Sequence, residues 1–198
     1  MERGVRVAIG GVVVGALTSV GQEFLPFALS PLANSVGVWS LAAFALALVE
    51  MRPRRAALLG AAALVTMLAG YAVATVARGF AVGVALLAFW GFAPIVAGPA
   101  LGVGAAWLRR RDPLRSAAGM ALIAGILIGE GLYGLTVIAG STPALYWTVE
   151  IGVGLTVVVI ASSERLRSLR YRLIGAVLTT TAAAAFYLAY SRTWIDLF

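Results

Sequence analysis

Two glutamates lie where a carboxyl group is least expected, inside long apolar stretches of the chain. Glu130 stands in the run from Gly125 to Tyr133, whose other members are apolar, small or aromatic, and Glu150 stands in the apolar stretch 144–162. A charged side chain at the centre of a membrane helix costs about 2.5–3.5 kcal/mol on insertion scales. Acids that persist at such positions commonly bind a ligand or move a proton. Glu130 is therefore our leading candidate for chemistry.

Aromatic side chains share helix faces with these two acids. Tyr133 follows Glu130 by three residues, and Tyr146 and Trp147 precede Glu150 by four and three residues. Residues three or four apart are neighbours on a helix surface. The sequence therefore predicts a chamber lined by carboxyl groups and aromatic rings.

A few further polar and aromatic residues complete the predicted site. The candidate catalytic acids are Glu130, Glu150 and Glu23. The candidate substrate-binding residues are Gln22, Asn34, Trp39, Trp90, Tyr133, Tyr146 and Trp147. Glu50 lies beside Arg52 and Arg54, where an ordinary surface ion pair accounts for it. We therefore leave Glu50 outside the predicted site.

The amino-acid composition excludes several kinds of catalytic and metal-binding chemistry. The chain contains no cysteine, no histidine and no lysine, and all fifteen basic residues are arginine. This excludes disulfides and thiolate metal sites, the most common general base and metal ligand, and a Schiff-base lysine. We expect no metal and no cofactor.

Apolar stretches of membrane-spanning length account for almost the whole chain. Hydrophobic residues make up 62% of it and the mean hydropathy is +0.99, whereas soluble domains are about 45–50% apolar. About twenty apolar residues cross a hydrocarbon core of ~30 Å. We predict an all-α integral membrane protein with a single domain over residues 1–198. Its seven transmembrane helices are expected at 5–24, 33–50, 56–77, 84–108, 116–139, 144–162 and 173–191.

The arginines set the expected orientation. Thirteen of the fifteen lie before span one or after spans two, four and six, which leaves Arg78 and Arg192 for the other side. Cytoplasmic connections carry the excess of arginine, so the N-terminus is predicted to be cytoplasmic and the C-terminus outside, in a multi-pass protein of the plasma membrane. Glu130 and Glu150 then lie in the outer half, with most of the aromatic residues. The arginines form short clusters rather than a patch, so we expect the bilayer as partner and no nucleic acid.

Part of the sequence resembles a known family. The residues that carry the likeness are Gly15–Gln22, Leu25–Pro26, Pro31–Ser35 and Trp39, with a weaker echo at Gly129–Gly131. They are similar to a family of small actinobacterial multi-pass membrane proteins of unknown function. The size, the seven spans and the intramembrane acids also resemble membrane-bound terpene cyclases, a likeness of architecture that implies an isoprenoid substrate.

The leading hypothesis is a metal-independent terpene cyclase. Protonation of an alkene or epoxide needs a carboxylic acid held neutral in an apolar pocket, π faces that stabilise a carbocation, and exclusion of water. Glu130 would be the general acid, and Trp39, Trp90, Tyr133 and Trp147 would form the wall. A hydrophobic small molecule could enter from the bilayer.

Two other classes stay open. A proton-coupled transporter of small molecules also places Glu near a discontinuous helix. A non-catalytic membrane scaffold needs no cavity, because protonated Glu130 or Glu150 would then join helices through a backbone carbonyl or Asn34. The sequence carries no signal for an oligomeric state.

Overall fold

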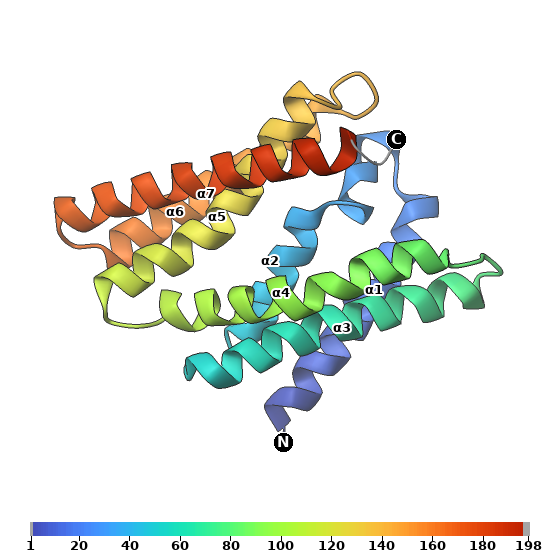
Figure 1. The fold of residues 1–198 in the computed structure, drawn as a ribbon, viewed down its shortest axis with the longest axis horizontal. Helices are drawn as coiled ribbons and strands as arrows, with labels where there is room; N and C mark the ends of the chain where they lie inside the picture. The colour runs from blue at the N-terminus through green and yellow to red at the C-terminus, as the bar shows by residue number, and fades with distance from the viewer. Residues whose placement is uncertain (1, 196–198) are drawn as a thin grey trace.

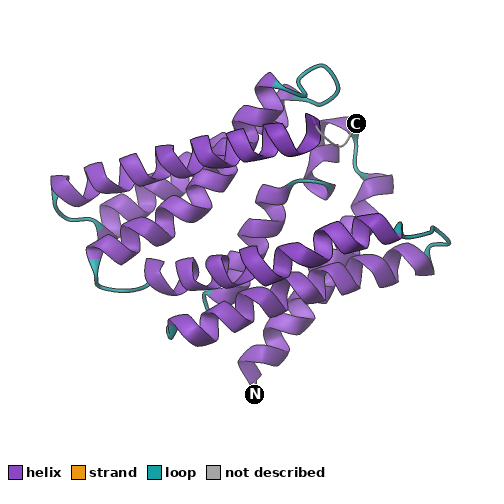
Figure 2. Cartoon of the chain, in the orientation of Figure 1, coloured by secondary structure: helices purple, strands orange, loops and turns teal. Residues whose placement is uncertain are grey.

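The computed structural model describes the backbone of residues 2–195 and, within this range, the side chains of all residues except 84–89, 93 and 193–195. The described chain is helical throughout and contains no strand (Figure 2). The elements in order are α1 (Glu2–Phe24), the 3₁₀ helix η1 (Phe27–Ala33), α2 (Val36–Ala47), α3 (Pro53–Ala77), α4 (Val84–Leu108), α5 (Pro113–Thr136), α6 (Ala144–Arg165) and α7 (Leu169–Ile195).

The helices form two groups of three with α2 between them (Figure 1). Helices α1 and α4 both pack on α3, and helices α6 and α7 both pack on α5. Helix α2 contacts α3, α4 and α5, and the packing of α4 on α5 joins the groups directly. Within the second group, α5 is the helix that packs on α2.

Several helices are long and apolar enough to cross a membrane. Five meet this criterion among the described residues, and the bent pair of η1 and α2 makes a sixth if it counts as one span. Helix α4 is not among these five. Over the described residues it contributes a shorter apolar segment, Pro94–Leu108. The chain is therefore a multi-pass membrane protein.

The second predicted span is shorter than expected. It was placed at 33–50, whereas α2 covers only the 12 residues Val36–Ala47, and η1 precedes it at a bend of 54°. At 1.5 Å per residue, α2 covers about 18 Å. The break lies at Ser35, whose extended backbone and side-chain hydrogen bond from the Val38 N–H begin a new helix. Helix α2 therefore starts inside the protein rather than at its edge.

Glycines bring the long helices into backbone contact. A Cβ atom placed on Gly15 of α1 would lie 1.8 Å from the Met67 carbonyl oxygen of α3. On Gly102 of α4, it would lie 1.9 Å from the Ala56 carbonyl oxygen of α3. Glycines in α1 and α4 thus allow close packing, which lets dispersion hold helices together in a membrane.

Replacing Gly15 with Ala should force α1 and α3 apart. Because the Cβ would meet backbone atoms that cannot rotate away, we expect a loss of about 1–3 kcal/mol in stability, the usual cost of overpacking. The measurement is thermal unfolding in detergent micelles. Gly152→Ala in α6 is the matched control, since nothing lies within 4 Å of its Cβ position and alanine favours the helix by about 1 kcal/mol. Equal destabilisation of both variants would contradict the packing account.

Candidate functional site

The N-terminus of α2 faces the carboxyl group of Glu130 on α5. The Val36 N–H donates to Glu130 Oε1 at 2.8 Å, and the Gly37 N–H donates to Glu130 Oε2. The first N–H groups of a helix have no partner within it and carry partial positive charge. Glu130, only 2% exposed, therefore caps a helix that lies far from it in sequence.

Ser35 joins Glu130 to the second acid. Its hydroxyl lies 2.9 Å from Glu130 Oε2 and 3.2 Å from Glu150 Oε1, and it accepts a hydrogen bond from the Val38 N–H at 3.0 Å. A serine hydroxyl has one proton to donate. If that proton goes to Glu130, the contact with Glu150 forms a hydrogen bond only when Glu150 is the donor. The network is complete with Glu130 as carboxylate and Glu150 as neutral acid.

The two carboxyl groups meet above Gly37. A Cβ atom on this residue would lie 2.1 Å from Glu150 Oε1 and 2.7 Å from Glu130 Oε2, so only glycine leaves room for both. Like charges this close do not both ionise, and one proton is shared instead. Within the described part of the chain, Glu150 Oε2 is the buried side-chain oxygen that has no hydrogen-bond partner.

Both acids lie at the same depth. Glu130 comes six residues before the end of α5 at Thr136, and Glu150 comes six residues after the start of α6 at Ala144. Each is therefore about 9 Å from the end of its helix. The fifth span was predicted to end at residue 139, which placed Glu130 farther from the end of its helix than the structure does. Among the described residues, no three His, Cys, Asp or Glu side chains form a group that could hold a metal ion.

A cavity of about 310 Å³ opens beside Glu130, and we call it the Glu130 cavity. Its rings come mainly from α5 and α7, where Tyr133 and Tyr190 meet edge to face at 4.8 Å. Trp147 adds a third ring, and its indole N–H donates to Thr142 Oγ1 at 2.8 Å. The lining residues are Ser30, Pro31, Asn34, Glu130, Tyr133, Ile138, Thr142, Trp147 and Tyr190.

A second cavity of about 160 Å³, the Gln22 cavity, lies on the other side of the break before α2. Gln22 donates to Asn34 Oδ1 at 2.9 Å and accepts from the Tyr71 hydroxyl at 3.1 Å. Asn34 borders both cavities, so the segment between η1 and α2 separates them. The lining residues are Thr18, Gln22, Ala33, Asn34, Ser35, Val36, Trp39, Leu68, Tyr71 and Trp90.

The predicted site residues are therefore divided between two places. Tyr133 and Trp147 line the Glu130 cavity, whereas Gln22, Trp39 and Trp90 line the Gln22 cavity. The prediction of one chamber did not include the partition at Asn34.

Three predicted residues, Glu150, Tyr146 and Glu23, line neither cavity. Tyr146 is buried and packs edge to face on Trp147 at 4.8 Å. Glu23 forms an ion pair with Arg78, and Arg78 also donates to the Ser19 hydroxyl at 3.0 Å. Tyr146 thus supports the wall of the Glu130 cavity, and Glu23 belongs to the C-terminal ends of α1 and α3.

Sequence reasoning missed Ser35 and Gly37 as members of the site. Serine before an apolar run is a typical N-cap signal. The usual Glu or Gln three residues later, which would complete a capping box, is absent because Val38 stands there. That combination indicates a helix start that lacks a local acidic partner, and Glu130 fills this role from α5.

The fold and the site define an all-helical, multi-pass membrane protein with a buried pair of carboxyl groups at the start of a broken helix. The chain belongs to a family of unknown function (DUF6518), which matches residues 1–194. No curated protein and no solved structure matches it. The predicted likeness to a family of unknown function is confirmed by this match.

Substitution by glutamine should separate the roles of the two acids. Glu150→Gln supplies an amide N–H that replaces the shared proton, so we expect a stability change below about 1 kcal/mol. Glu130→Gln offers one acceptor oxygen where two are used, and it brings an amide N–H towards the α2 donors. We expect a loss of about 1.5–3 kcal/mol, the range for hydrogen bonds to charged groups.

Chemical unfolding of both variants in micelles measures the difference. Glu164→Gln, at the exposed end of α6, is the control for loss of one glutamate. The assignment is wrong if Glu150→Gln is the more damaging change, or if both variants unfold alike.

Proposed function

We propose that this protein is a membrane-bound, metal-independent isoprenoid cyclase or isomerase that protonates an alkene in the Glu130 cavity. The observation that carries the proposal is a buried pair of carboxyl groups joined by Ser35, of which Glu130 lines an aromatic cavity. A protonated carboxyl, π faces and an apolar enclosure are what carbocation chemistry needs. The sequence-based resemblance to membrane-bound terpene cyclases, if it holds, implies the same chemistry.

The proposal includes seven spans in the plasma membrane with the N-terminus in the cytoplasm. Helix α4, with 25 residues, is long enough to be the seventh span. The arginine-bearing connections α4–α5 and α6–α7 lie at one end of the bundle, and the connections α3–α4 and α5–α6 lie at the other (Figure 1). This arrangement supports the predicted orientation, because arginine is enriched on the cytoplasmic side.

Proton transfer would run from Glu150 through Ser35 to Glu130. Glu150 gives its proton to the Ser35 oxygen as the Ser35 proton passes to Glu130, which is then the acid at the cavity wall. The alkene π electrons take this proton and form a C–H bond, which leaves a carbocation on the neighbouring carbon. A second alkene of the substrate closes a ring onto that carbon. Loss of a proton from an adjacent carbon to the Glu130 carboxylate restores the pair, and no co-reactant is consumed.

The cavity limits the substrate to a compact apolar molecule. Its volume of about 310 Å³ lies at the lower end of small-molecule sites, which range over about 300–1,000 Å³. Tyr133, Trp147 and Tyr190 offer ring faces or edges to an enclosed chain. Linear isoprenoids and small prenylated aromatic compounds fit this description, and they can enter from the bilayer.

The test is deuterium incorporation in lipid nanodiscs prepared in D₂O. The wild-type protein is incubated with a panel of linear isoprenoids and prenylated aromatic compounds, and products are analysed by mass spectrometry. We expect a cyclised or isomerised product that carries deuterium. Glu130→Gln should lower the rate by at least about 10²-fold, the lower limit for loss of general acid catalysis.

Glu164→Gln is the control for this assay and should keep full activity. Each variant is checked for folding by circular dichroism, so that loss of activity is separated from loss of structure. Unchanged activity of a folded Glu130→Gln variant would overturn the proposed role. Absence of product with the entire panel would leave the carboxyl pair a structural cap, as in a scaffold.

A second candidate, a proton-coupled carrier, is favoured by the broken helix. Carriers bind cargo at discontinuous helices whose N-terminal ends point at negative groups, as the N-terminus of α2 does at Glu130. Packing in the predicted inner half of the bundle argues against a carrier, because a core with Phe44, Met67 and Leu101 fills the region between α2, α3 and α4. The enzyme therefore remains the preferred proposal.

Uptake into proteoliposomes distinguishes the carrier from the enzyme. A carrier would accumulate labelled apolar or weakly acidic compounds when a pH gradient is imposed, and Glu150→Gln would remove the dependence on the gradient. Collapse of the gradient by a protonophore is the control. Equal uptake by proteoliposomes and by empty liposomes would exclude the carrier function.

A further inference from the structure

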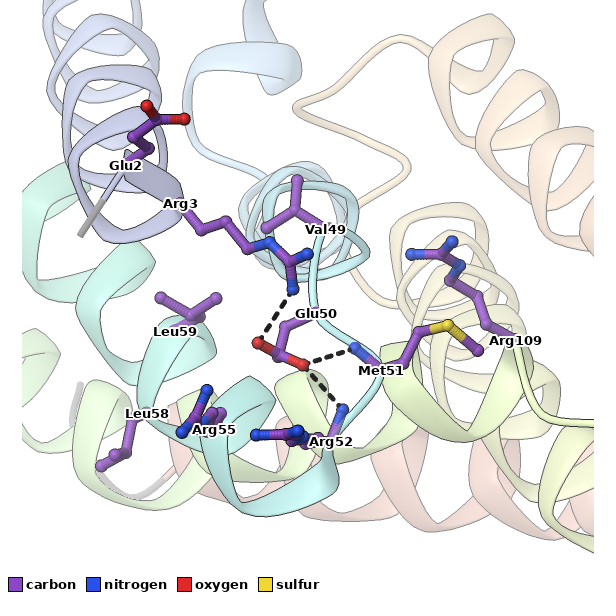
Figure 3. Close-up of a pocket in the computed structure, with 10 residues that line it drawn as sticks. All are labelled: Glu2, Arg3, Val49, Glu50, Met51, Arg52, Arg55, Leu58, Leu59 and Arg109. Carbon is purple, nitrogen blue, oxygen red and sulfur yellow. Dashed lines mark hydrogen bonds and ion pairs between the residues drawn. The ribbon is translucent and has the colours of Figure 1, made fainter.

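A further cavity lies at the opposite end of α2 from the acid pair. It measures about 920 Å³ and is shown in Figure 3. We call it the arginine cavity, since four arginines line it against two glutamates. The lining residues are Glu2, Arg3, Val49, Glu50, Met51, Arg52, Arg55, Leu58, Leu59 and Arg109. They come from the start of α1, the α2–α3 connection, the start of α3 and the end of α4.

Glu50 is engaged by the protein itself. Its carboxylate accepts hydrogen bonds from the Met51 N–H at 2.9 Å, from the Arg52 N–H at 3.0 Å and from Arg3 at 3.1 Å, as Figure 3 shows. The hydrogen bond from the Arg52 N–H, with smaller contributions from Met51 and Arg3, holds the pKa of Glu50 below its usual value. The carboxylate thus stays charged at neutral pH and fixes the α2–α3 turn.

Two of the arginines remain available to a ligand. Arg109 donates to the Leu48 carbonyl and Arg3 to Glu50. Over the described part of the chain, the guanidinium groups of Arg52 and Arg55 have no hydrogen bond or ion pair. Both stand at the start of α3, whose N-cap residue Arg52 provides no side-chain cap. Helix N-termini and paired arginines both favour phosphate groups.

An apolar edge borders the same cavity. Leu58 on the first turns of α3 is 72% exposed, Met51 is 49% exposed and Val49 is 40% exposed. In a membrane protein, such side chains at the end of a span contact lipid rather than water. A ligand that matches both parts has a phosphate group and an acyl chain.

We propose that the arginine cavity is a binding site for the headgroup of an anionic phospholipid. Arg52 and Arg55 bind the phosphate, and the acyl chains lie along Leu58 towards the bilayer. Basic pockets between the ends of membrane helices are known to hold anionic headgroups. This site is separate from the Glu130 cavity and does not depend on the proposed enzymatic function.

Lipid titration with matched arginine variants tests the site. Purified protein in a neutral detergent is titrated with phosphatidylglycerol, and binding is followed by native mass spectrometry and by the rise in melting temperature. Arg52→Gln/Arg55→Gln should bind about 30-fold more weakly, because each arginine near an anionic surface contributes about fivefold.

The control is Arg54→Gln/Arg111→Gln, which removes the same charge from exposed residues that do not line the cavity. It should bind within about twofold of the wild type. If the double cavity variant fails to fold, Arg55→Gln alone serves, with an expected loss of about fivefold.

Three outcomes would overturn the proposal. Equal weakening by the control variant would show general attraction between charges rather than a site. Equal binding of phosphatidylcholine would show that the anionic character of the headgroup is not recognised. Protection by inorganic phosphate at concentrations that displace the lipid would identify free phosphate as the ligand.

Discussion

The carboxyl group of Glu130 and the first N–H groups of α2 satisfy each other inside an apolar bundle. Helix α2 begins at Val36, whose first N–H groups have no partner within the helix, and each backbone group left unpaired in a bilayer costs several kcal/mol. A carboxylate buried alone carries a cost of similar size. Hydrogen bonds from Val36 and Gly37 to Glu130 offset both costs together. The broken second span and the acid in the fifth therefore depend on each other.

This mutual dependence organises the rest of the site. One negative charge is enough for the α2 N-terminus, so Glu150 is accommodated as a neutral acid that reaches Ser35 at 3.2 Å. Gly37 leaves the space that both carboxyl groups need. The break that exposes the α2 donors also brings Asn34 between the two cavities. At its other end α2 leads into the turn that Glu50 fixes beside the arginine cavity.

Sequence patterns predicted what depends on local composition and failed where distant segments meet. Apolar length located the helices to within a few residues, α2 within 33–50 included. It did not predict the break at Ser35, because the break changes hydrogen bonding without changing hydropathy. Tyr133 and Glu130, which are three residues apart on α5, both line the Glu130 cavity. The contact of Glu130 with Ser35 spans 95 residues, so no periodicity could predict it. The division into two cavities follows from the path of η1, which irregular turn geometry determines.

The protonation of the two glutamates tests the central claim most directly. Infrared difference spectroscopy with isotope-labelled glutamate distinguishes a neutral carboxylic acid from a carboxylate and can be carried out in lipid at neutral pH. The account predicts a buried carboxylic acid band that Glu150→Gln removes and Glu130→Gln retains. A band that Glu130→Gln removes and Glu150→Gln retains, or the absence of any such band in the wild-type protein, would contradict it.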